Sequence, residues 1–175
     1  MTEIAQWFDR KFTFDFPVEM YPNLRVRLGG TPARVEEMVR GLGHEALTRK
    51  PEGKWSILEN IGHLFDAEDL WYGRVDEFLR GEQKLAAADL KNTRTHGAGH
   101  NMRPATAVLQ EFRVARVRLV RWLEGLKPAD FARTALHPRL NQPMRLVDHM
   151  YFIAEHDDHH LARIAELREE AAHGR

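Results

Sequence analysis

Cysteine is absent from the 175-residue sequence, and this absence excludes several kinds of chemistry. The chain can form no disulfide, no thiolate zinc site and no iron–sulfur cluster, and it has no cysteine nucleophile. The absence also fits a reducing compartment. Because residues 1–10 carry charged side chains and no apolar run, we expect no signal peptide and predict a cytoplasmic protein.

An excess of charge of one sign is absent as well. The 26 Lys and Arg residues balance the 26 Asp and Glu residues. A protein that binds nucleic acid through its phosphates needs surplus positive charge, and so does one that binds an anionic membrane. No apolar stretch reaches the roughly 20 residues that cross a bilayer. We therefore expect neither nucleic acid nor a membrane as a partner.

Strand patterns are scarce, and no internal repeat or linker divides the chain. Only residues 12–16 alternate apolar and polar side chains, and Pro17 ends the alternation. We interpret this stretch as an extended lead-in or as part of a short helix. With 43% hydrophobic residues, the chain can bury a core without cross-links. We predict a single domain, residues 1–175, with its core at about residues 20–171.

Helical periodicity is strong in four regions. The first, residues 21–42, has a predicted break at Gly29-Gly30, after which Thr31 and Pro32 restart the helix as N-cap and first helical residue. The second begins at a Ser56–Glu59 capping box and ends near Gly81. The third covers residues 104–126 and the fourth residues 143–171. Four amphipathic helices predict an all-α four-helix bundle.

Two connections separate the later helices. Residues 82–103 form a long polar segment between the second and third helices. We favour a partly ordered connection with one helical turn near residues 86–90, and the alternative is a lid, because segments of this length often cover functional sites. Residues 129–142 are predicted to be a loop.

Histidine, by contrast, is abundant: the chain has ten. On the second helix, His63 lies about 120° from the centre of the apolar face, at a flank that borders a groove between helices. On the fourth helix, His149, His156 and His160 fall within about 40° of one another. His156 and His160 have the i, i+4 spacing that places two imidazoles on one metal ion. His159 points further round the helix, although His156 with His159 is an alternative pair.

Two histidines leave a metal ion under-coordinated, so a third ligand must come from elsewhere. His63 is the best candidate because it too lies on a helix flank. Three neutral imidazoles suit zinc, nickel, copper or ferrous iron, and we favour zinc or nickel over iron. We therefore predict a divalent metal site at His63, His156 and His160. The alternative is a solvated helix face without a metal.

Five other histidines are predicted to lie outside any metal site. His44, His137 and His173 fall in expected loops or the tail, where they would be solvated. His96 and His100 repeat the i, i+4 spacing, but they lie in the long connection, where no helix is expected to hold that spacing.

Two acidic residues, Glu68 and Asp157, fall on otherwise apolar helix faces. A buried carboxylate needs a partner. We favour an ion pair with an arginine over a role in orienting the ligand imidazoles. Three tryptophans, Trp55, Trp71 and Trp122, are predicted to be core aromatics.

Two segments of the chain resemble the DinB-like family, the superfamily that includes bacillithiol S-transferases and the metal domain of mycothiol-dependent maleylpyruvate isomerases. They are Lys54–Glu59 running into Gly62–Leu64, and His156–His160. Asp89–Asn92, His100-Asn101 and the helix with Phe112 and Arg116 add to the resemblance, which covers about residues 20–170.

The resemblance implies a four-helix bundle and a metal held by one histidine of the second helix and an H-x-x-x-H pair of the last. Carried over, these ligands are His63, His156 and His160. Many relatives continue the pair with Arg-Gly-Gln, whereas this chain has Leu161-Ala162-Arg163. The departure makes Arg163 a candidate contact for an anion.

The resemblance further implies a metal-dependent transferase that activates a low-molecular-weight thiol, or water, for attack on a small electrophile. The alternative is a non-catalytic, stress-associated metal-binding protein. A di-iron carboxylate site fits poorly, because the one E-x-x-H sequence is residues 170–173 in the tail. We also expect a homodimer, for which Trp7, Phe12, Phe14 and Phe16 could form the contact. The alternative for Trp7 is that it anchors the N-terminal segment to the rest of the chain.

Overall fold

A computed structural model describes residues 4–173 of the chain, apart from the side chain of His173. Its long helices are α1 (Tyr21–Val39), α3 (Ile57–Arg80), α5 (Ala105–Glu124) and α6 (Leu146–His173). Between them lie the short helices α2 (His44–Thr48) and α4 (Thr93–Gly97) and an antiparallel hairpin of β1 (Thr134–His137) and β2 (Gln142–Arg145). The predicted four-helix bundle is confirmed. No helix within the described residues is long and apolar enough to cross a membrane.

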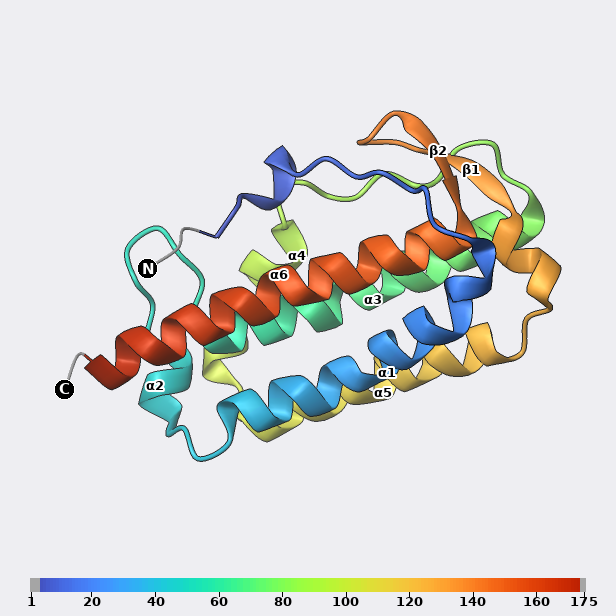
Figure 1. Cartoon of the computed structure of the whole chain (residues 1–175). Helices are drawn as coiled ribbons and strands as arrows, with labels where there is room; N and C mark the ends of the chain where they lie inside the picture. The colour runs from blue at the N-terminus through green and yellow to red at the C-terminus, as the bar shows by residue number, and fades with distance from the viewer. Residues whose placement is uncertain (1–3, 174–175) are drawn as a thin grey trace.

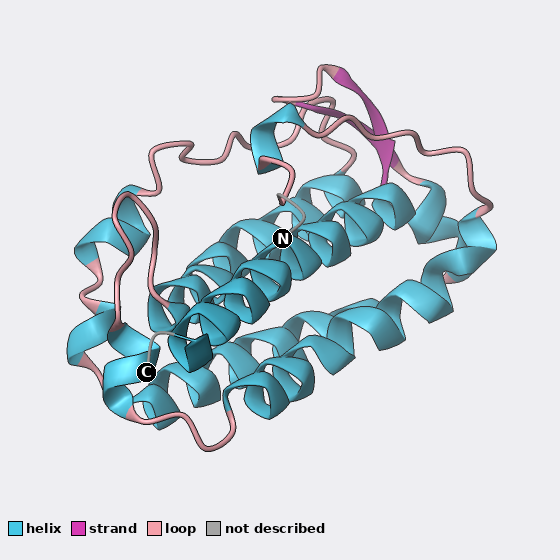
Figure 2. Ribbon diagram, turned by 60° about the vertical axis from the view of Figure 1, so that its left-hand side comes forward, coloured by secondary structure: helices cyan, strands magenta, loops and turns pink. Residues whose placement is uncertain are grey.

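The four long helices form two parallel pairs (Figure 1). Helices α1 and α6 run in one direction, and α3 and α5 run in the other. Helix α1 packs against α5 and α6, and so does α3. Consecutive long helices α1 and α3 are therefore diagonal in the bundle, as are α5 and α6. The hairpin lies at one end of this bundle (Figure 2).

The long connection between α3 and α5 follows from this topology. Because α3 and α5 are parallel, the chain leaves α3 at one end of the bundle and must return to the other, about 36 Å away for a 24-residue helix. The predicted turn at residues 86–90 is wrong, since residues 86–89 are irregular. Lys84 pairs with Leu136 of β1, and the Ala86 carbonyl accepts hydrogen bonds from Arg74. The backbone of this stretch is therefore held to the hairpin and to α3.

The predicted helix break at Gly29-Gly30 is also wrong, because α1 runs straight through it. Packing on two neighbouring helices outweighs the cost of about 1 kcal/mol for each glycine. Thr31 is therefore inside the helix and not its N-cap. Pro32 has no N–H, so the carbonyl of Leu28 lacks its usual helical donor, and Arg116 Nη1 donates to that carbonyl at 3.2 Å.

The predicted loop at residues 129–142 contains more regular structure than expected. It holds a 3₁₀ turn, Pro128–Ala132, and most of the hairpin. Helix α6 begins at Leu146, three residues later than predicted, because residues 142–145 are used in β2. The carboxylate of Asp148 accepts the Arg145 amide at 2.8 Å and so caps the start of α6.

A layer of buried polar side chains divides the hydrophobic core into two parts. The part nearer the hairpin includes Leu24, Leu28, Trp71, Val75, Leu119, Met150 and Ile153. The other part includes Val35, Ile57, Ile61, Val108, Phe112, Leu161 and Ile164. Between these two sets, the four long helices contribute the buried polar residues Thr31, Glu68, Arg116 and Asp157, which form this layer.

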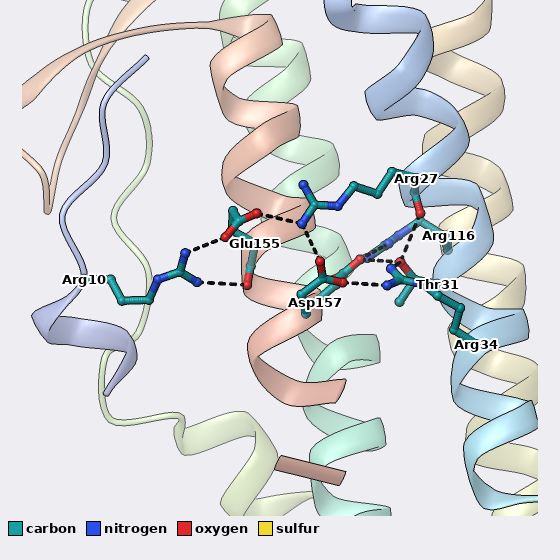
Figure 3. Close-up of polar contacts among 8 residues, drawn as sticks. Arg10, Arg27, Thr31, Arg34, Arg116, Glu155 and Asp157 are labelled. Carbon is teal, nitrogen blue, oxygen red and sulfur yellow. Dashed lines mark hydrogen bonds and ion pairs between the residues drawn. The ribbon is translucent and has the colours of Figure 1, made fainter. Parts of the chain in front are cut away.

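Arg116 of α5 is the centre of this polar layer, and Figure 3 shows it beside Asp157 and Thr31. Its Nε and Nη2 donate to Glu68 Oε1 at 2.8 and 2.6 Å, and Nη1 and Nη2 donate to the Asp157 carboxylate. Together with the bond to Leu28, every N–H of the guanidinium has an acceptor. The Thr31 hydroxyl donates to Asp157 at 2.8 Å. The predicted pairing of Glu68 and Asp157 with an arginine is confirmed.

Ion pairs continue this network to the surface of α6 (Figure 3). Glu155 accepts hydrogen bonds from Arg10 at 2.5 Å and from Arg27 at 2.6 Å. Asp158 accepts from Arg27 and, at 2.7 Å, from Arg34. These pairs join α1 and the N-terminal segment to α6.

The N-terminal segment crosses the outside of α6 (Figure 1). Its aromatic side chains Trp7, Phe12, Phe14 and Phe16 pack against the core, and the Trp7 ring lies 5.1 Å from that of Phe152. Trp7 is thus an anchor within the chain. The four aromatics that we expected at a dimer contact are used internally, and the homodimer itself stays a prediction.

We predict that Arg116→Leu destabilises the fold by about 3–5 kcal/mol, because it leaves two carboxylates buried without a counter-charge. Urea unfolding at pH 7, followed by circular dichroism, measures this loss. The matched control is Arg118→Leu on the same helix, where an exposed guanidinium lies over Tyr72 and contributes about 1 kcal/mol or less. Equal losses in the two variants would contradict the central role of Arg116.

A second prediction concerns pH. Burial raises the pKa of Glu68 to about 7, against the opposing effect of Arg116. Between pH 4.5 and 7 the folded state therefore binds more protons at Glu68 than the unfolded state, and the contribution of Glu68 to stability falls as pH rises.

Glu68→Gln mimics the protonated carboxyl and keeps an acceptor for Arg116. When the pH rises from 5 to 8, we expect the free energy of unfolding of the variant to increase by about 1–3 kcal/mol relative to that of the unmodified protein. Urea unfolding of both proteins at the two pH values, with a chelator present throughout, gives this difference. A difference that does not change with pH would refute the raised pKa.

Candidate metal centre

His63 of α3 and His156 and His160 of α6 meet in the groove between these helices. One ring nitrogen from each residue lies within 4.8 Å of the other two, and the Nε2 atoms of His63 and His156 are 3.2 Å apart. Ligands at about 2.1 Å from a tetrahedral zinc ion are about 3.4 Å from one another. The spacing is therefore close to that of a ligand set.

The orientation of His63 is fixed by a hydroxyl and a carboxylate. The Thr95 hydroxyl donates its proton to Asp66 at 2.8 Å, so it can only accept from His63 Nδ1, which lies 3.1 Å away. His63 thus carries its proton on Nδ1 and leaves Nε2 free to bind a metal. Histidines that bind metal ions commonly donate from their other ring nitrogen to such an acceptor.

His160 is oriented in the same way by an amide. Asn60 donates from Nδ2 to the Ser56 carbonyl at 2.8 Å, which directs its Oδ1 toward His160 Nδ1 at 2.9 Å. The proton of His160 is therefore on Nδ1, and its Nε2 is free. Two of the three candidate ligands are thus preset by polar groups on α3 and α4.

A glycine makes room for the group that holds Asp66. A side chain at Gly62 would place its Cβ only 2.3 Å from the His100 ring. His100 Nε2 lies 2.9 Å from Asp66, and the next residue, Asn101, accepts from the capping Ser56 hydroxyl at 2.7 Å. The end of the long connection is therefore clamped to the start of α3, next to His63.

Burial keeps the candidate ligands neutral. It lowers the pKa of His63 to about 4 and holds the pKa values of His156 and His160 well below 6.5. Burial also raises the pKa of Asp66, but hydrogen bonds from His100 and Thr95 outweigh this and leave it below its usual value. At neutral pH the cluster therefore consists of uncharged imidazoles, the form that binds metal ions.

The cluster fits a divalent metal ion on the chemistry of its donors. His156 is 5% exposed, and its Nδ1 has no hydrogen-bond partner. The facing Nε2 atoms of His63 and His156 can share at most one proton, because the His63 proton is on Nδ1. A cation on the Nε2 side would satisfy all three lone pairs at once.

A cavity of about 690 Å³ opens beside the cluster. Trp55, Trp71, Trp7 and Phe152 line it together with the three histidines. Residues 87–90, from the long connection, form another part of the wall. The volume is in the range of small-molecule sites, so a metabolite-sized ligand can reach the metal position.

The other histidines divide into exposed and buried ones. His44 and His96 are exposed, and the prediction for His173 falls on a side chain outside the described residues. His137 is 2% exposed, so its prediction as a solvated histidine is wrong; the unforeseen hairpin packs it against Phe152.

Neither His149 nor His159 belongs to the group of three converging histidines, although the His159 ring lies 5.3 Å from that of His160. His149 is fully buried against Trp71 and Phe78, two helical turns before His156. His159 lines the cavity with its ring 5.9 Å from Trp7, and burial lowers its pKa to about 4.

The remaining sequence predictions concern three tryptophans and Arg163. Trp71 is buried as expected, but Trp55 is a half-buried wall residue whose ring lies 4.8 Å from His63. Trp122 is half-buried against Tyr72. Arg163 lines the cavity and donates to Glu166 at 3.1 Å; its role with an anion stays a prediction.

Sequence reasoning missed the supporting residues Asn60, Asp66 and Thr95. Asn60 carried a signal, because it is polar beside the apolar Ile57 and Ile61 and lies one turn before His63. Thr95 carried none, since only the folded connection brings it to α3.

The fold and the site define a class of protein: a four-helix bundle with three converging histidines at a small-molecule cavity. The family model of the DinB superfamily matches residues 27–164. The chain belongs to the DinB superfamily, and the resemblance seen in the sequence is confirmed.

Proteins similar to the chain include two from Bacillus subtilis. The uncharacterized protein YuaE from Bacillus subtilis (strain 168) is 29% identical over 145 residues, which cover 75% of this chain and 88% of YuaE. The structure of YfiT from Bacillus subtilis superposes with a TM-score of 0.81 over 93% of this chain and 94% of YfiT, at 21% identity. YfiT is described as a probable metal-dependent hydrolase with an unusual four-helix bundle topology. At 21% identity, this structural similarity establishes that the two proteins share a fold.

We predict that His63→Ala, His156→Ala and His160→Ala each abolish zinc binding, whereas His159→Ala retains it. Thr95→Val, which removes both the acceptor for His63 and the hydrogen bond to Asp66, should weaken zinc binding by about 10–100-fold. Elemental analysis after dialysis and competition with a zinc chelator measure these effects. Equal loss for His159→Ala and His160→Ala would refute the assigned ligands.

Proposed function

We propose that the chain binds one divalent metal ion through His63, His156 and His160 and acts as a metal-dependent transferase of low-molecular-weight thiols. The observation that carries the proposal is the set of three neutral, converging imidazoles on the wall of a cavity. Membership of the DinB superfamily supports metal binding. A divalent ion with three protein ligands keeps a coordination position free and lowers the pKa of a thiol or water bound there.

The chain's own residues bind and orient the reactants. The aromatic side chains of Trp7, Trp55, Trp71 and Phe152 give the cavity apolar walls that exclude water and suit an organic electrophile. The thiol has to come from outside, because the chain has no cysteine. A volume of about 690 Å³ is large enough for both molecules.

Water is the second candidate nucleophile. The description of YfiT as a probable metal-dependent hydrolase favours this reading. The same ligands and the same free position would serve it, so the two proposals differ in the nucleophile and share the site. A non-catalytic metal-binding protein is the remaining alternative.

An activity assay distinguishes these three functions. The zinc- or nickel-loaded protein is incubated with a panel of small thiols and 1-chloro-2,4-dinitrobenzene, and separately with p-nitrophenyl acetate without thiol. We expect conjugate formation that requires both metal and thiol and that is lost in His63→Ala.

The control is the folding of the variant. Because the core of four helices supplies most of the burial, His63→Ala should keep its helical circular dichroism. Ester hydrolysis without thiol would favour water as the nucleophile. A metal-loaded protein inactive in both assays would support the non-catalytic alternative.

A further inference from the structure

The end of the cavity near the hairpin gathers hydrogen-bond donors that have no acceptor. Four side chains line it there: Trp71 and Arg74 of α3, His137 of β1, and Arg139 of the hairpin turn. Neither arginine forms an ion pair within the described residues. This end is separate from the three-histidine cluster but belongs to the same cavity.

Arg74 is a buried cation without a carboxylate partner. It is 1% exposed, and its Nε and Nη2 donate to the Ala86 carbonyl at 3.0 and 2.7 Å. Burial lowers its pKa to about 10. The nearby Glu77 carboxylate accepts the Ala86 amide at 2.8 Å and does not pair with the guanidinium. Arg74 Nη1 is left facing His137.

The contact between Arg74 and His137 brings two donors together. The Leu140 amide donates to His137 Nδ1 at 3.1 Å, so Nδ1 carries no proton. Burial, with the charges of Arg74 and Arg139, lowers the pKa of His137 to about 3, so the ring is neutral and its proton is on Nε2. That N–H lies 3.3 Å from Arg74 Nη1, which can only donate.

Two more donors complete the set. Arg139 Nη2 and Trp71 Nε1 are buried and have no hydrogen-bond partner. Arg139 is held by the rings of Trp7 and Phe152, 5.6 Å from each, and its Nη1 donates to the Phe8 carbonyl. Unsatisfied buried donors are costly, and clustered ones with net positive charge suit an oxyanion.

We propose that Arg74, His137, Arg139 and Trp71 form a subsite for an oxyanion, a carboxylate or a phosphate, on the small molecule that occupies the cavity. The inference rests on the proposed function insofar as the cavity holds a substrate. It specifies the chemical class of that substrate: an anionic molecule, with its charged group at the hairpin end and its reacting group near the histidines.

The dimensions of the cavity agree with one molecule reaching both ends. The His137 ring lies 4.9 Å from Phe152, and Phe152 is one helical turn before His156 on α6. The Trp71 ring lies 5.4 Å from His156 and 5.6 Å from the Arg74 guanidinium, so it lines the cavity from one end to the other. A metabolite with an anionic group a few bonds from its reacting atom spans this distance.

Calorimetric titration of the zinc-loaded protein with succinate and, separately, inorganic phosphate tests the subsite. Arg139→Gln is the test variant because Arg139 is only half-buried. We expect it to weaken binding of the preferred probe by about tenfold or more, the loss of a charge-assisted hydrogen bond. Arg139→Lys should restore part of the affinity. Dimethyl succinate, which lacks the charge, should not bind.

Arg118→Gln is the matched control, because Arg118 also lies over an aromatic ring but outside the cavity, and its binding should be unchanged. The preferred probe identifies the source of the oxyanion, carboxylate or phosphate. No saturable binding of either probe at millimolar concentrations, or equal binding by Arg139→Gln and the unmodified protein, would overturn the subsite.

Titration of His63→Ala separates the subsite from the metal. Probe binding that persists in His63→Ala and depends on Arg139 supports the subsite even if the protein binds no zinc and the proposed metal function fails. Probe binding lost in His63→Ala but retained in Arg139→Gln would place the anion on the metal and refute the subsite.

Discussion

The buried guanidinium of Arg116 is the interaction on which the rest of the structure depends. It binds Glu68 of α3 and Asp157 of α6 and donates a hydrogen bond to the Leu28 carbonyl of α1. One side chain of α5 therefore contacts all three other long helices. Apolar packing tolerates small shifts along a helix, whereas these bonds do not. The layer therefore fixes the relative heights of the helices, and the apolar residues on either side form the two parts of the core.

The same register positions the candidate metal centre. Asp157 directly follows His156, and Glu68 lies five residues after His63, so the bonds that align α3 with α6 also bring these histidines together. Thr95, Asn60 and Asp66 then set the ring orientations. The buried charges thus support the site through geometry and do not contact the ligand nitrogens.

The cavity combines two chemically different ends. One end offers lone pairs of neutral imidazoles, and the other offers N–H donors of Arg74, Arg139 and His137 without acceptors. Because α3 and α5 are parallel, residues 81–104 must run back along the bundle. This connection forms the wall that separates both ends of the cavity from solvent. The N-terminal segment completes the enclosure with Trp7, whose ring lies 5.2 Å from His156.

Local sequence determined the long helices and the Ser56 capping box, because periodicity and capping act within a few turns of chain. It also determined that His63, His156 and His160 lie on helix flanks. The placement of Glu68 and Asp157 on apolar faces showed that each needs a cationic partner. Tertiary structure decided what depends on distant partners. It kept α1 continuous through Gly29-Gly30, buried His137 in a hairpin that the loop pattern did not indicate, and separated His149 from the cluster despite its shared helix flank. It also brought Thr95 to His63 and Arg139 to the cavity, since hydrogen bonds between residues dozens of positions apart exist only once the helices have packed.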